Sequence, residues 1–408
     1  MLNTGLACLA IGGVIAVIYS YALYPLVLFV VGSISQGLRD VAFVFRKRDR
    51  RIDAGRGADA DEAGRDWPPV AIVISAYNEQ THIVPRIENL LALDYPAERL
   101  RAYIGSDGSR DRTAELLQQF RDDPRIVALP FEQNRGKASV LNDLVSRTSE
   151  PIVVFSDANT YFERGALKKL VARFDDAQVG GVTGELRLLG NAGGDNQDSL
   201  YWRIEQFLKF FEARIGGLLG ANGAIYAIRR DLWQPIRPDT ICDDFCIAMN
   251  VSAAGHRLVY EPKAWAEEDT PEHIGEEVKR RIRIGIGNFQ ALVRHPEYLT
   301  RTSLGTAFAY VSHKVLRWTA PHLLLIALMA SVALAWLESS PGWALYALAQ
   351  AAAYAAAWAG WRLTSRGVKL PTVVKLAAFL FALNWAFLVA SWRYVTGRYG
   401  GSWGRTQR

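Results

Sequence analysis

The chain has 408 residues, of which half are hydrophobic, and it carries a formal net charge of +6. Its three cysteines, Cys8, Cys242 and Cys246, show neither the spacing of zinc ligands nor a disulfide framework. No nucleic-acid-binding motif accompanies the basic charge, so we expect no nucleic-acid partner. Apolar residues instead crowd both ends of the chain, which predicts a soluble unit held between membrane segments.

The first segment, residues 2–31, lacks charged side chains and is long enough to cross a bilayer of roughly 30 Å. It is too long for a signal-peptide core and has no small-residue cleavage site, so we expect a permanent anchor over residues 2–32. A basic cluster follows, at Arg39, Arg46, Lys47, Arg48, Arg50 and Arg51. Because basic residues favour the cytosolic side and anionic headgroups, residues 33–67 are predicted to form a cytosolic linker beside the lipid bilayer.

The middle of the chain alternates short apolar runs, rich in β-branched residues, with helix-like stretches. Strands are predicted over residues 70–75, 102–104, 125–129 and 151–155, and helices over residues 81–92 and from residue 113. This alternation is typical of an open α/β sheet.

Polar residues follow three of these strands directly, in the segments 77–79, 106–109 and 156–159. Each segment alone fits an ordinary turn. In open α/β sheets, however, ligands bind beyond the carboxyl ends of the strands. Three polar segments at one edge of the sheet therefore favour a binding site there.

The end of the chain is apolar again. Residues 275–317 mix basic with apolar side chains, which predicts amphipathic helices at the membrane surface. Three candidate spans follow, at residues 318–336, 343–361 and 373–392. We therefore expect about three transmembrane helices within residues 318–395, before a tail over residues 396–408.

Seven short motifs carry the chemistry. In chain order they are Ser75-Ala76-Tyr77-Asn78-Glu79, Ser106-Asp107-Gly108-Ser109, Asn134-Arg135-Gly136-Lys137-Ala138, Asp157-Ala158-Asn159, Gly220-Ala221-Asn222-Gly223-Ala224-Ile225-Tyr226, Cys242-Asp243-Asp244 and Arg280-Arg281-Ile282-Arg283-Ile284. In this order they resemble the family 2 inverting glycosyltransferases, including the membrane-embedded synthases of cellulose, hyaluronan, chitin and poly-N-acetylglucosamine. The resemblance implies a GT-A type, Rossmann-like α/β domain for nucleotide-sugar binding over residues 68–274, flanked by transmembrane α-helices.

The resemblance assigns donor binding to six residues, Tyr77, Glu79, Asp107, Lys137, Asp157 and Arg283. A flat tyrosine ring suits stacking on a nucleobase, although Tyr77 also fits a rim aromatic that packs on the sheet. Asp107 is expected to accept hydrogen bonds from the base, and Glu79 to bind the nucleotide. Lys137 would place positive charge near the diphosphate, and the planar fork of Arg283 can hold diphosphate oxygens.

Asp157 and Asn159 stand in the place of the family's Asp-X-Asp metal site, which implies a Mg²⁺ or Mn²⁺ cofactor. A hard divalent cation prefers oxygen ligands and neutralises a departing diphosphate. Because an amide replaces the second carboxylate here, we expect Asp157 to hold the ion and Asn159 to assist.

Asp243 and Asp244 resemble the acidic pair that is catalytic in the family. Inverting transfer needs a base that takes the proton of the acceptor hydroxyl as its oxygen attacks the anomeric carbon. The resemblance implies that Asp244 is this base and that Asp243 is its partner. Taken alone, the pair also fits the cap of a helix.

The acceptor is expected to lie beside Gly220, Asn222 and Gly223, where small residues let the backbone approach a bulky ligand. The same residues also fit a tight turn that enters a strand. Arg280 and Ile284 occupy the Gln and Trp positions of the family's Gln-X-X-Arg-Trp motif. The missing tryptophan argues against the synthesis of long chains.

Together these features predict a multi-pass protein of the cell membrane, in a bacterium the inner membrane, with a cytosolic catalytic domain. It would transfer a hexose or N-acetylhexosamine from a UDP-sugar to a polysaccharide or a lipid-linked acceptor. Two alternatives remain open. One is a transferase that adds a single sugar to a polyprenyl phosphate or lipid-linked oligosaccharide. The other is an inactive membrane protein that senses a nucleotide sugar.

Overall fold

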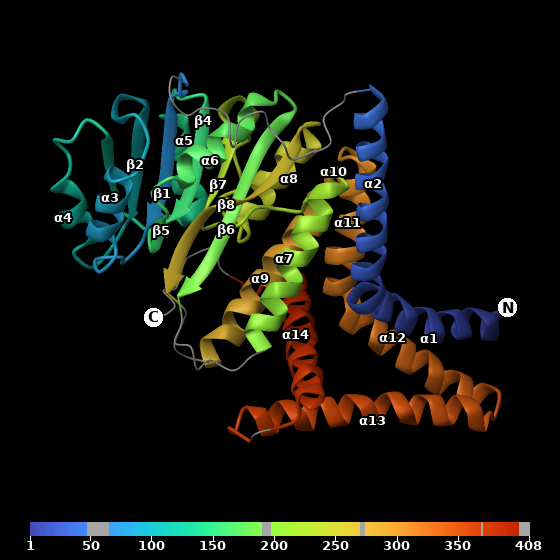
Figure 1. Ribbon diagram of the computed structural model, residues 1–408. Helices are drawn as coiled ribbons and strands as arrows, with labels where there is room; N and C mark the ends of the chain where they lie inside the picture. Colours follow the sequence, from blue (N-terminus) through green and yellow to red (C-terminus); the bar gives the residue numbers. More distant parts are fainter. Residues whose placement is uncertain (47–64, 190–196, 270–273, 369, 400–408) are drawn as a thin grey trace.

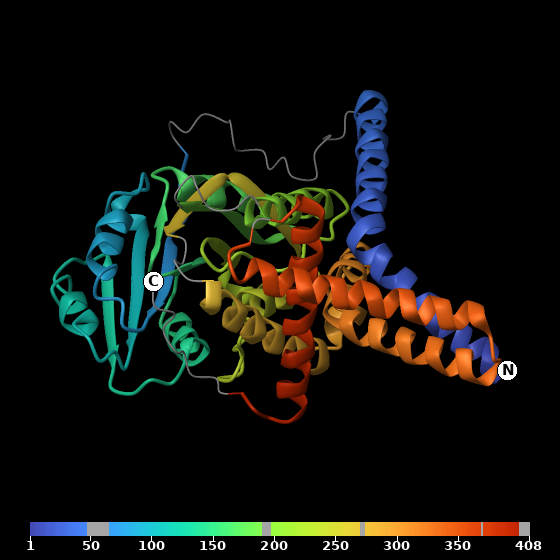
Figure 2. The same ribbon diagram turned by 90° about the horizontal axis from the view of Figure 1, so that it is seen from below.

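The structure is a computed structural model that describes residues 1–46, 65–189, 197–269, 274–368 and 370–399 (Figure 1). The basic run from Lys47 to Arg51, most of the expected linker and the tail from residue 400 lie outside these residues. An eight-stranded sheet with its covering helices forms one part of the molecule, and long helices project from it (Figures 1 and 2).

The strands are β1 (Val70–Ala76), β2 (Leu100–Asp107), β3 (Ile126–Phe131), β4 (Ile152–Asp157), β5 (Thr160–Phe162), β6 (Val179–Leu189), β7 (Tyr226–Arg229) and β8 (Arg257–Asp269). Their order in the sheet is β3-β2-β1-β4-β7-β6-β8-β5. The first four strands pair in parallel, whereas β7 is antiparallel to both of its neighbours. The predicted α/β fold is thus confirmed, with an antiparallel strand that the sequence pattern did not indicate.

The parallel strands are level at their carboxyl ends. Ser75 of β1 lies opposite Gly105 of β2 on one side and Asp157 of β4 on the other. The chain builds β2 and β3 on one side of β1 and then returns to place β4 on the other side. Such a change of direction is the point at which open α/β sheets bind ligands.

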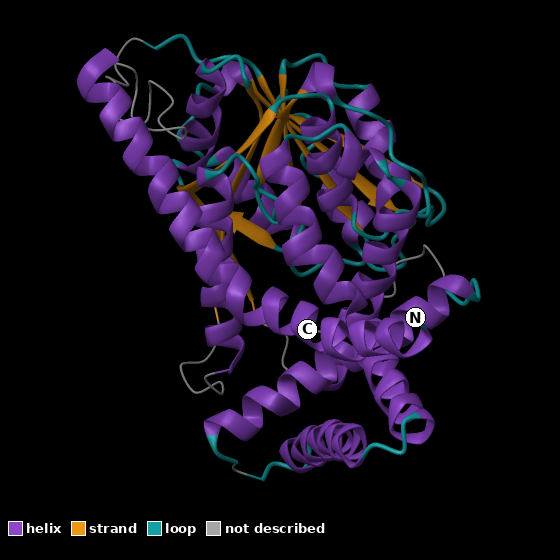
Figure 3. Ribbon diagram, turned by 90° about the vertical axis from the view of Figure 1, so that its right-hand side faces the viewer, coloured by secondary structure: helices purple, strands orange, loops and turns teal. Residues whose placement is uncertain are grey.

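Helices cover both faces of the sheet because its strands are apolar on both sides (Figure 3). On one face, Ile72 and Ile74 pack against α3 (Ile83–Leu91) and α6 (Ala166–Ala172). On the other face, Val73 packs against α5 (Lys137–Ser146) and α8 (Asp243–Ala253). The expected helix from residue 113 is α4 (Thr113–Gln118).

A third apolar core joins the sheet domain to the C-terminal helices. In it, Phe245 of α8 packs with Phe289 of α9 (Ile274–Arg294), Trp318 of α12 (Leu316–Leu337) and Phe387 of α14 (Thr372–Val395). The chain between α9 and α12 forms α10 (Glu297–Thr300), α11 (Leu304–Ala309) and a π-helical segment (Tyr310–Val315). The base of the apolar helices therefore rests directly on α8, which carries the predicted catalytic pair.

The N-terminal helix is longer than the expected anchor. α1 (Leu2–Ile18) continues through a π-helical turn (Tyr19–Leu23) into α2 (Tyr24–Arg46), which turns away and lies along α7 (Gln197–Arg214) (Figure 1). Within the described part of the chain, three helical segments are long and apolar enough to cross a membrane: Leu2–Ala42, Leu304–Leu337 and Thr372–Val395. The second expected distal span coincides with α13 (Pro341–Thr364), which is not among them.

Candidate active site

The loops after β1 and β2 are tied to each other by hydrogen bonds. The amide of Asn78 donates to Ser109 Oγ (3.1 Å), and the amide of Glu79 donates to Thr113 Oγ1 (2.7 Å). Asn78 is held at φ 56°, a left-handed conformation that asparagine tolerates. These bonds place Tyr77, which is half-buried, at the carboxyl edge of the sheet as expected.

Asp107 is buried at the end of β2 and accepts two backbone hydrogen bonds. The amide of Arg135 donates to Oδ1 (2.8 Å) and the amide of Gly136 to Oδ2 (2.9 Å). Gly136 has φ +87°, which favours glycine at this position. Asp107 therefore holds the loop that leads into α5 and places Lys137, a contact that the sequence did not predict.

Lys137 lies between two carboxylates that are far apart in the sequence. Its Nζ is 2.7 Å from Asp157 Oδ1, at the end of β4, and 3.2 Å from Asp243 Oδ2, at the start of α8. Burial opposes the charge of the lysine, but Asp157 and Asp243 outweigh it and hold the pKa of Lys137 above its ordinary value. The ammonium thus joins the predicted donor and catalytic motifs.

Asp244 is next to this ion pair and receives two backbone amides. Gly223 donates to Oδ2 (3.1 Å) and Phe245 to Oδ1 (2.8 Å). Burial, and then the charge of Asp243, raise the pKa of Asp244 to about 6. A carboxylate with that pKa is ionised at neutral pH and remains more basic than an ordinary aspartate, which suits a general base.

The glycine loop before β7 fits closely between the acidic residues. A Cβ atom on Gly223 would lie 3.1 Å from Asp244 Oδ2 and 3.7 Å from Asp157 Oδ2. The amide of Asn222 donates to Thr183 Oγ1 (2.9 Å), which fixes the loop on β6. The small residues of this motif therefore let the backbone approach both carboxylates.

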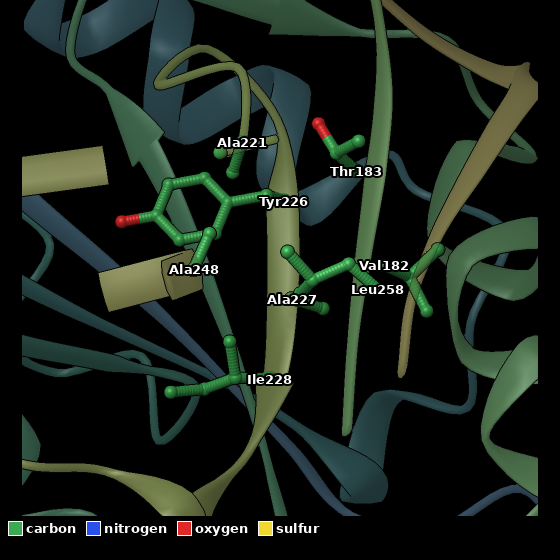
Figure 4. A pocket seen from close by; sticks show the side chains of 9 residues that line it. Val182, Thr183, Ala221, Tyr226, Ala227, Ile228, Ala248 and Leu258 are labelled. Atoms are coloured by element: carbon green, nitrogen blue, oxygen red, sulfur yellow. The ribbon is translucent and has the colours of Figure 1, made fainter. Parts of the chain in front are cut away.

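A small pocket lies beneath the same loop, where Val182, Thr183, Ala221, Tyr226 and Ala248 gather (Figure 4). Its volume of about 10 Å³ has room for a single water molecule. It is a packing space under the glycine loop and is far too small for a nucleotide sugar.

Asn159 is oriented by a carboxylate that the sequence motifs did not include. Its Nδ2 donates to Glu268 Oε1 (3.1 Å), so its own Oδ1 points away from Glu268 and remains available as a ligand. Glu268 comes from β8, which pairs with β5 directly after Asn159. Its only signal in the sequence is an acidic run at the end of a strand.

The residues at this edge fit a divalent cation that takes most of its ligands from a diphosphate. Among the described residues, no cluster of three or more His, Cys, Asp or Glu side chains could hold a metal by itself. Asp157 Oδ2 and Asn159 Oδ1 are the protein oxygens that would contact an ion. One or two protein oxygens with phosphate oxygens are typical of Mg²⁺ sites.

α9 brings Arg283 to the site and leaves Arg280 and Ile284 exposed. The Cys242 thiol donates weakly to the carbonyl of Ile284 (3.6 Å), and Gly287 packs against Cys242 at the start of α8. Burial lowers the pKa of Arg283, with Arg280 acting in the same direction. Arg283 lies near enough to Asp243 and Asp157 for their charges to act on it, whereas Arg280 and Ile284 are exposed on the helix.

Comparisons with known proteins agree with this arrangement. The profile of the family described as "Glycosyltransferase like family 2" matches residues 68–287, more than half of the chain. The poly-beta-1,6-N-acetyl-D-glucosamine synthase of Staphylococcus aureus is 26% identical over 282 residues, which are 67% of this chain and 65% of that protein. The Staphylococcus epidermidis synthase is 26% identical over 231 residues, 55% of this chain and 56% of that protein. The chain therefore spans less than two thirds of the length of these relatives.

A solved structure shares the fold over nearly the whole chain. The mannosyltransferase PcManGT from Pyrobaculum calidifontis, solved with GDP-Man and Mn²⁺, superposes with a TM-score of 0.64 at 20% identity, over 92% of this chain and 99% of that one. This likeness shows the fold, which is of the GT-A type. With the family profile, it confirms the resemblance seen in the motifs: the chain belongs to the glycosyltransferase family 2-like enzymes.

Proposed function

We propose that this glycosyltransferase is a membrane-bound inverting enzyme that transfers a hexose or N-acetylhexosamine from a UDP-sugar to a polysaccharide or lipid-linked acceptor. The observation that carries the proposal is the contact of Lys137 with both Asp157 and Asp243, beside Asp244. Relatives that make poly-N-acetylglucosamine support an N-acetylhexosamine donor. A fold neighbour solved with GDP-Man and Mn²⁺ supports a nucleotide sugar and a divalent ion.

In this proposal Asp244 takes the proton of the acceptor hydroxyl while the hydroxyl oxygen attacks the anomeric carbon. The bond to the nucleotide diphosphate breaks on the opposite face of the sugar, so the linkage is inverted. Lys137 and Arg283 offset the charge that develops on the diphosphate. A divalent ion, held by Asp157 and Asn159, would supply further positive charge to the leaving group.

A second function, the addition of one or a few sugars, is favoured by Ile284. This side chain is 37% exposed on α9, and by its motif it takes the position of the tryptophan in the Gln-X-X-Arg-Trp motif that this segment resembles. Isoleucine has no aromatic face on which a sugar ring could rest between additions. Weaker holding of the acceptor speeds its dissociation between cycles.

Both functions are tested with the purified full-length protein in lipid nanodiscs, supplied with a panel of radiolabelled UDP- and GDP-sugars. We expect metal-dependent transfer or hydrolysis with at least one UDP-sugar, and the loss of turnover by roughly 10²-fold or more in Asp244→Asn with donor binding retained. Absence of turnover with every donor would instead favour the inactive sensor. Product sizing under excess donor separates short products from a high-molecular-mass polymer.

A further inference from the structure

Arg86 of α3 is a fully buried cation that contacts Ser156, the residue before Asp157. None of the described carboxylates lies within ion-pair distance of its guanidinium, which is unusual for a buried charge. Burial lowers the pKa of Arg86 to about 9, so the side chain stays charged at neutral pH. An apolar side chain would fill the same space without burying a charge. What arginine provides at this position is therefore the hydrogen bonds of its guanidinium.

Those contacts bracket the Asp157-Ala158-Asn159 turn. On one side, Nη2 donates to Ser156 Oγ (2.9 Å), at the residue before Asp157. On the other side, Nη1 donates to Asn89 Oδ1 (2.6 Å). Asn89 in turn bonds both backbone groups of Phe162, at 2.9 Å each, and the guanidinium lies 4.4 Å over the Phe162 ring. One planar fork thus holds the strands on both sides of the turn.

Ser156 extends this contact to the catalytic side. Its hydroxyl accepts from Arg86 and donates to the carbonyl of Ala224 (2.8 Å). Ala224 follows Gly223, whose amide donates to Asp244 (3.1 Å). Hydrogen bonds, with the short backbone from Gly223 to Ala224 between them, therefore link Arg86 to the turn that carries Asp157 and to the loop that holds Asp244.

We propose that Arg86 is a positioning residue, which fixes the turn carrying Asp157 relative to the loop that contacts Asp244. The inference rests on the proposed transfer reaction, in which the donor and the base must be held in one geometry. Small displacements of reacting groups lower rates steeply. Lysine has one ammonium in place of the two fixed Nη atoms, so it cannot reproduce the separate bonds to Ser156 and Asn89.

The test compares Arg86→Met, Arg86→Lys and a control, Arg173→Met, in the full-length protein. Arg173 is also largely buried in the sheet domain, but it pairs with Glu261 away from the site. For each folded variant, kcat, donor KM and melting temperature are measured. Amide exchange is followed in peptides that cover residues 157–162 and 220–226.

We expect both Arg86 variants to lower kcat by roughly 10- to 100-fold, with donor KM changed by less than about threefold. Amide exchange in both peptides should accelerate by roughly tenfold, since the turn and loop open more often. The control should lower the melting temperature and leave kcat and exchange in these peptides unchanged.

Wild-type kcat and wild-type exchange in either Arg86 variant would overturn the proposal, as would equal changes in the control. If Arg86→Met does not fold, Arg86→Lys decides the question, because it keeps the charge and loses only the fork. If the wild type turns over no nucleotide sugar, the proposed function fails. The exchange measurements then still show whether Arg86 fixes the turn and the loop.

Discussion

Asp244 receives amide hydrogen bonds from Gly223 and Phe245, whereas its burial and then its negatively charged neighbour Asp243 disfavour ionisation. Because the pKa of Asp244 is raised to about 6, a base at this position becomes protonated as the pH falls through that value. We expect the rate of transfer to fall about tenfold for each pH unit below the pKa. A pH–rate profile at saturating donor measures this acidic limb.

Asp243→Asn tests the contribution of Asp243 to that raised pKa, which comes second to burial. The substitution removes the neighbouring negative charge, so the acidic limb of the profile should move to lower pH. The rate at neutral pH is also expected to fall, because Asp243 contacts Lys137. An acidic limb that stays in place would contradict the contribution of Asp243, and an acidic limb that persists in Asp244→Asn would show that another group sets it.

Asn159 offers the clearest change to the expected metal site. Asn159→Asp adds a negatively charged oxygen ligand, so we expect Mn²⁺ in the presence of UDP to bind about tenfold more tightly. Asp157→Ala should abolish metal-dependent binding of UDP. Calorimetry measures both effects, and activity that persists unchanged in EDTA would contradict the metal role.

At the level of single residues, the sequence predicted which side chains gather but few of their contacts. Motif order placed Lys137, Asp157 and Asp243 in one site, and the structure brings them into contact, while their roles stay predictions. Arg86 and Glu268 were missed, because each acts from an element that carries no motif of its own. The direction of such side chains depends on packing between distant segments, which spacing does not encode.

Among the secondary-structure elements, the contact of α9 with α8 depends on glycine. A Cβ atom on Gly287 would lie 2.5 Å from Cys242 Sγ and 3.0 Å from Cys242 N, where the backbone cannot give way easily. Gly287→Ala should therefore destabilise the protein by about 1–3 kcal/mol and displace Arg283, lowering both the melting temperature and the rate of transfer.

Gly37→Ala in α2 is the matched control. Nothing lies within 4 Å of a Cβ atom at that position, and alanine favours helix. We expect its melting temperature to equal or exceed that of the wild type. If the two variants behave alike, close packing between α9 and α8 is not what Gly287 provides.

The sequence predicted the parallel strands β1, β2, β3 and β4 and missed the rest of the sheet for a physical reason. β1, β2, β3 and β4 are short apolar runs separated by helices, a pattern that itself indicates parallel pairing. β7 enters between β4 and β6 after a long excursion through α7. Its neighbours are thus set by tertiary packing, and no local pattern in the chain encodes them.

The arrangement of the apolar helices bears on the topology of the whole molecule. α1 runs antiparallel to α12: Tyr19 bonds Ser312 near the sheet domain (3.0 Å), whereas Ala10 packs with Leu334 far from it. α13 then returns along α12, since Gln350 bonds Ser331 (3.0 Å). These three helices project together from the sheet domain, with the N-terminus at their far end (Figures 1 and 2).

α14 differs from them because it stays near the sheet domain. Its first half packs on the returning end of α13, where Trp361 lies 5.9 Å from Phe381. Its second half packs on α9 and α8 through Phe387. We therefore expect α1, α12 and α13 to cross the membrane and α14 to lie along the cytosolic side, although α14 is apolar enough to span.

This topology places the basic residues near the ends of α13 and α14 on the cytosolic side, where positive charge is usually found. Three crossings from an external N-terminus bring Arg362 and Arg366, at the end of α13, back to the cytosolic side. Arg393 and Arg398, which follow in and after α14, lie there as well. If α14 also crossed, the last two arginines would lie outside, against the usual distribution of positive charge.

α13 carries no Asp, Glu, Lys or Arg before Arg362, so it can span despite its modest hydropathy.

Cysteines introduced one at a time in a background that lacks all three native cysteines (Cys8→Ser, Cys242→Ser, Cys246→Ala) test the arrangement in intact cells with a membrane-impermeant thiol reagent. Ser340→Cys, in the turn between α12 and α13, should be labelled from outside. Ser365→Cys, at the end of α13, should be labelled only after the cells are opened, and a reporter fused to the C-terminus should be cytosolic. External labelling at residue 365, or an external C-terminal reporter, would show that α13 or α14 crosses differently. Residues 340 and 365 flank α13, so their labelling shows whether α13 crosses. The C-terminal reporter then shows whether α14 crosses.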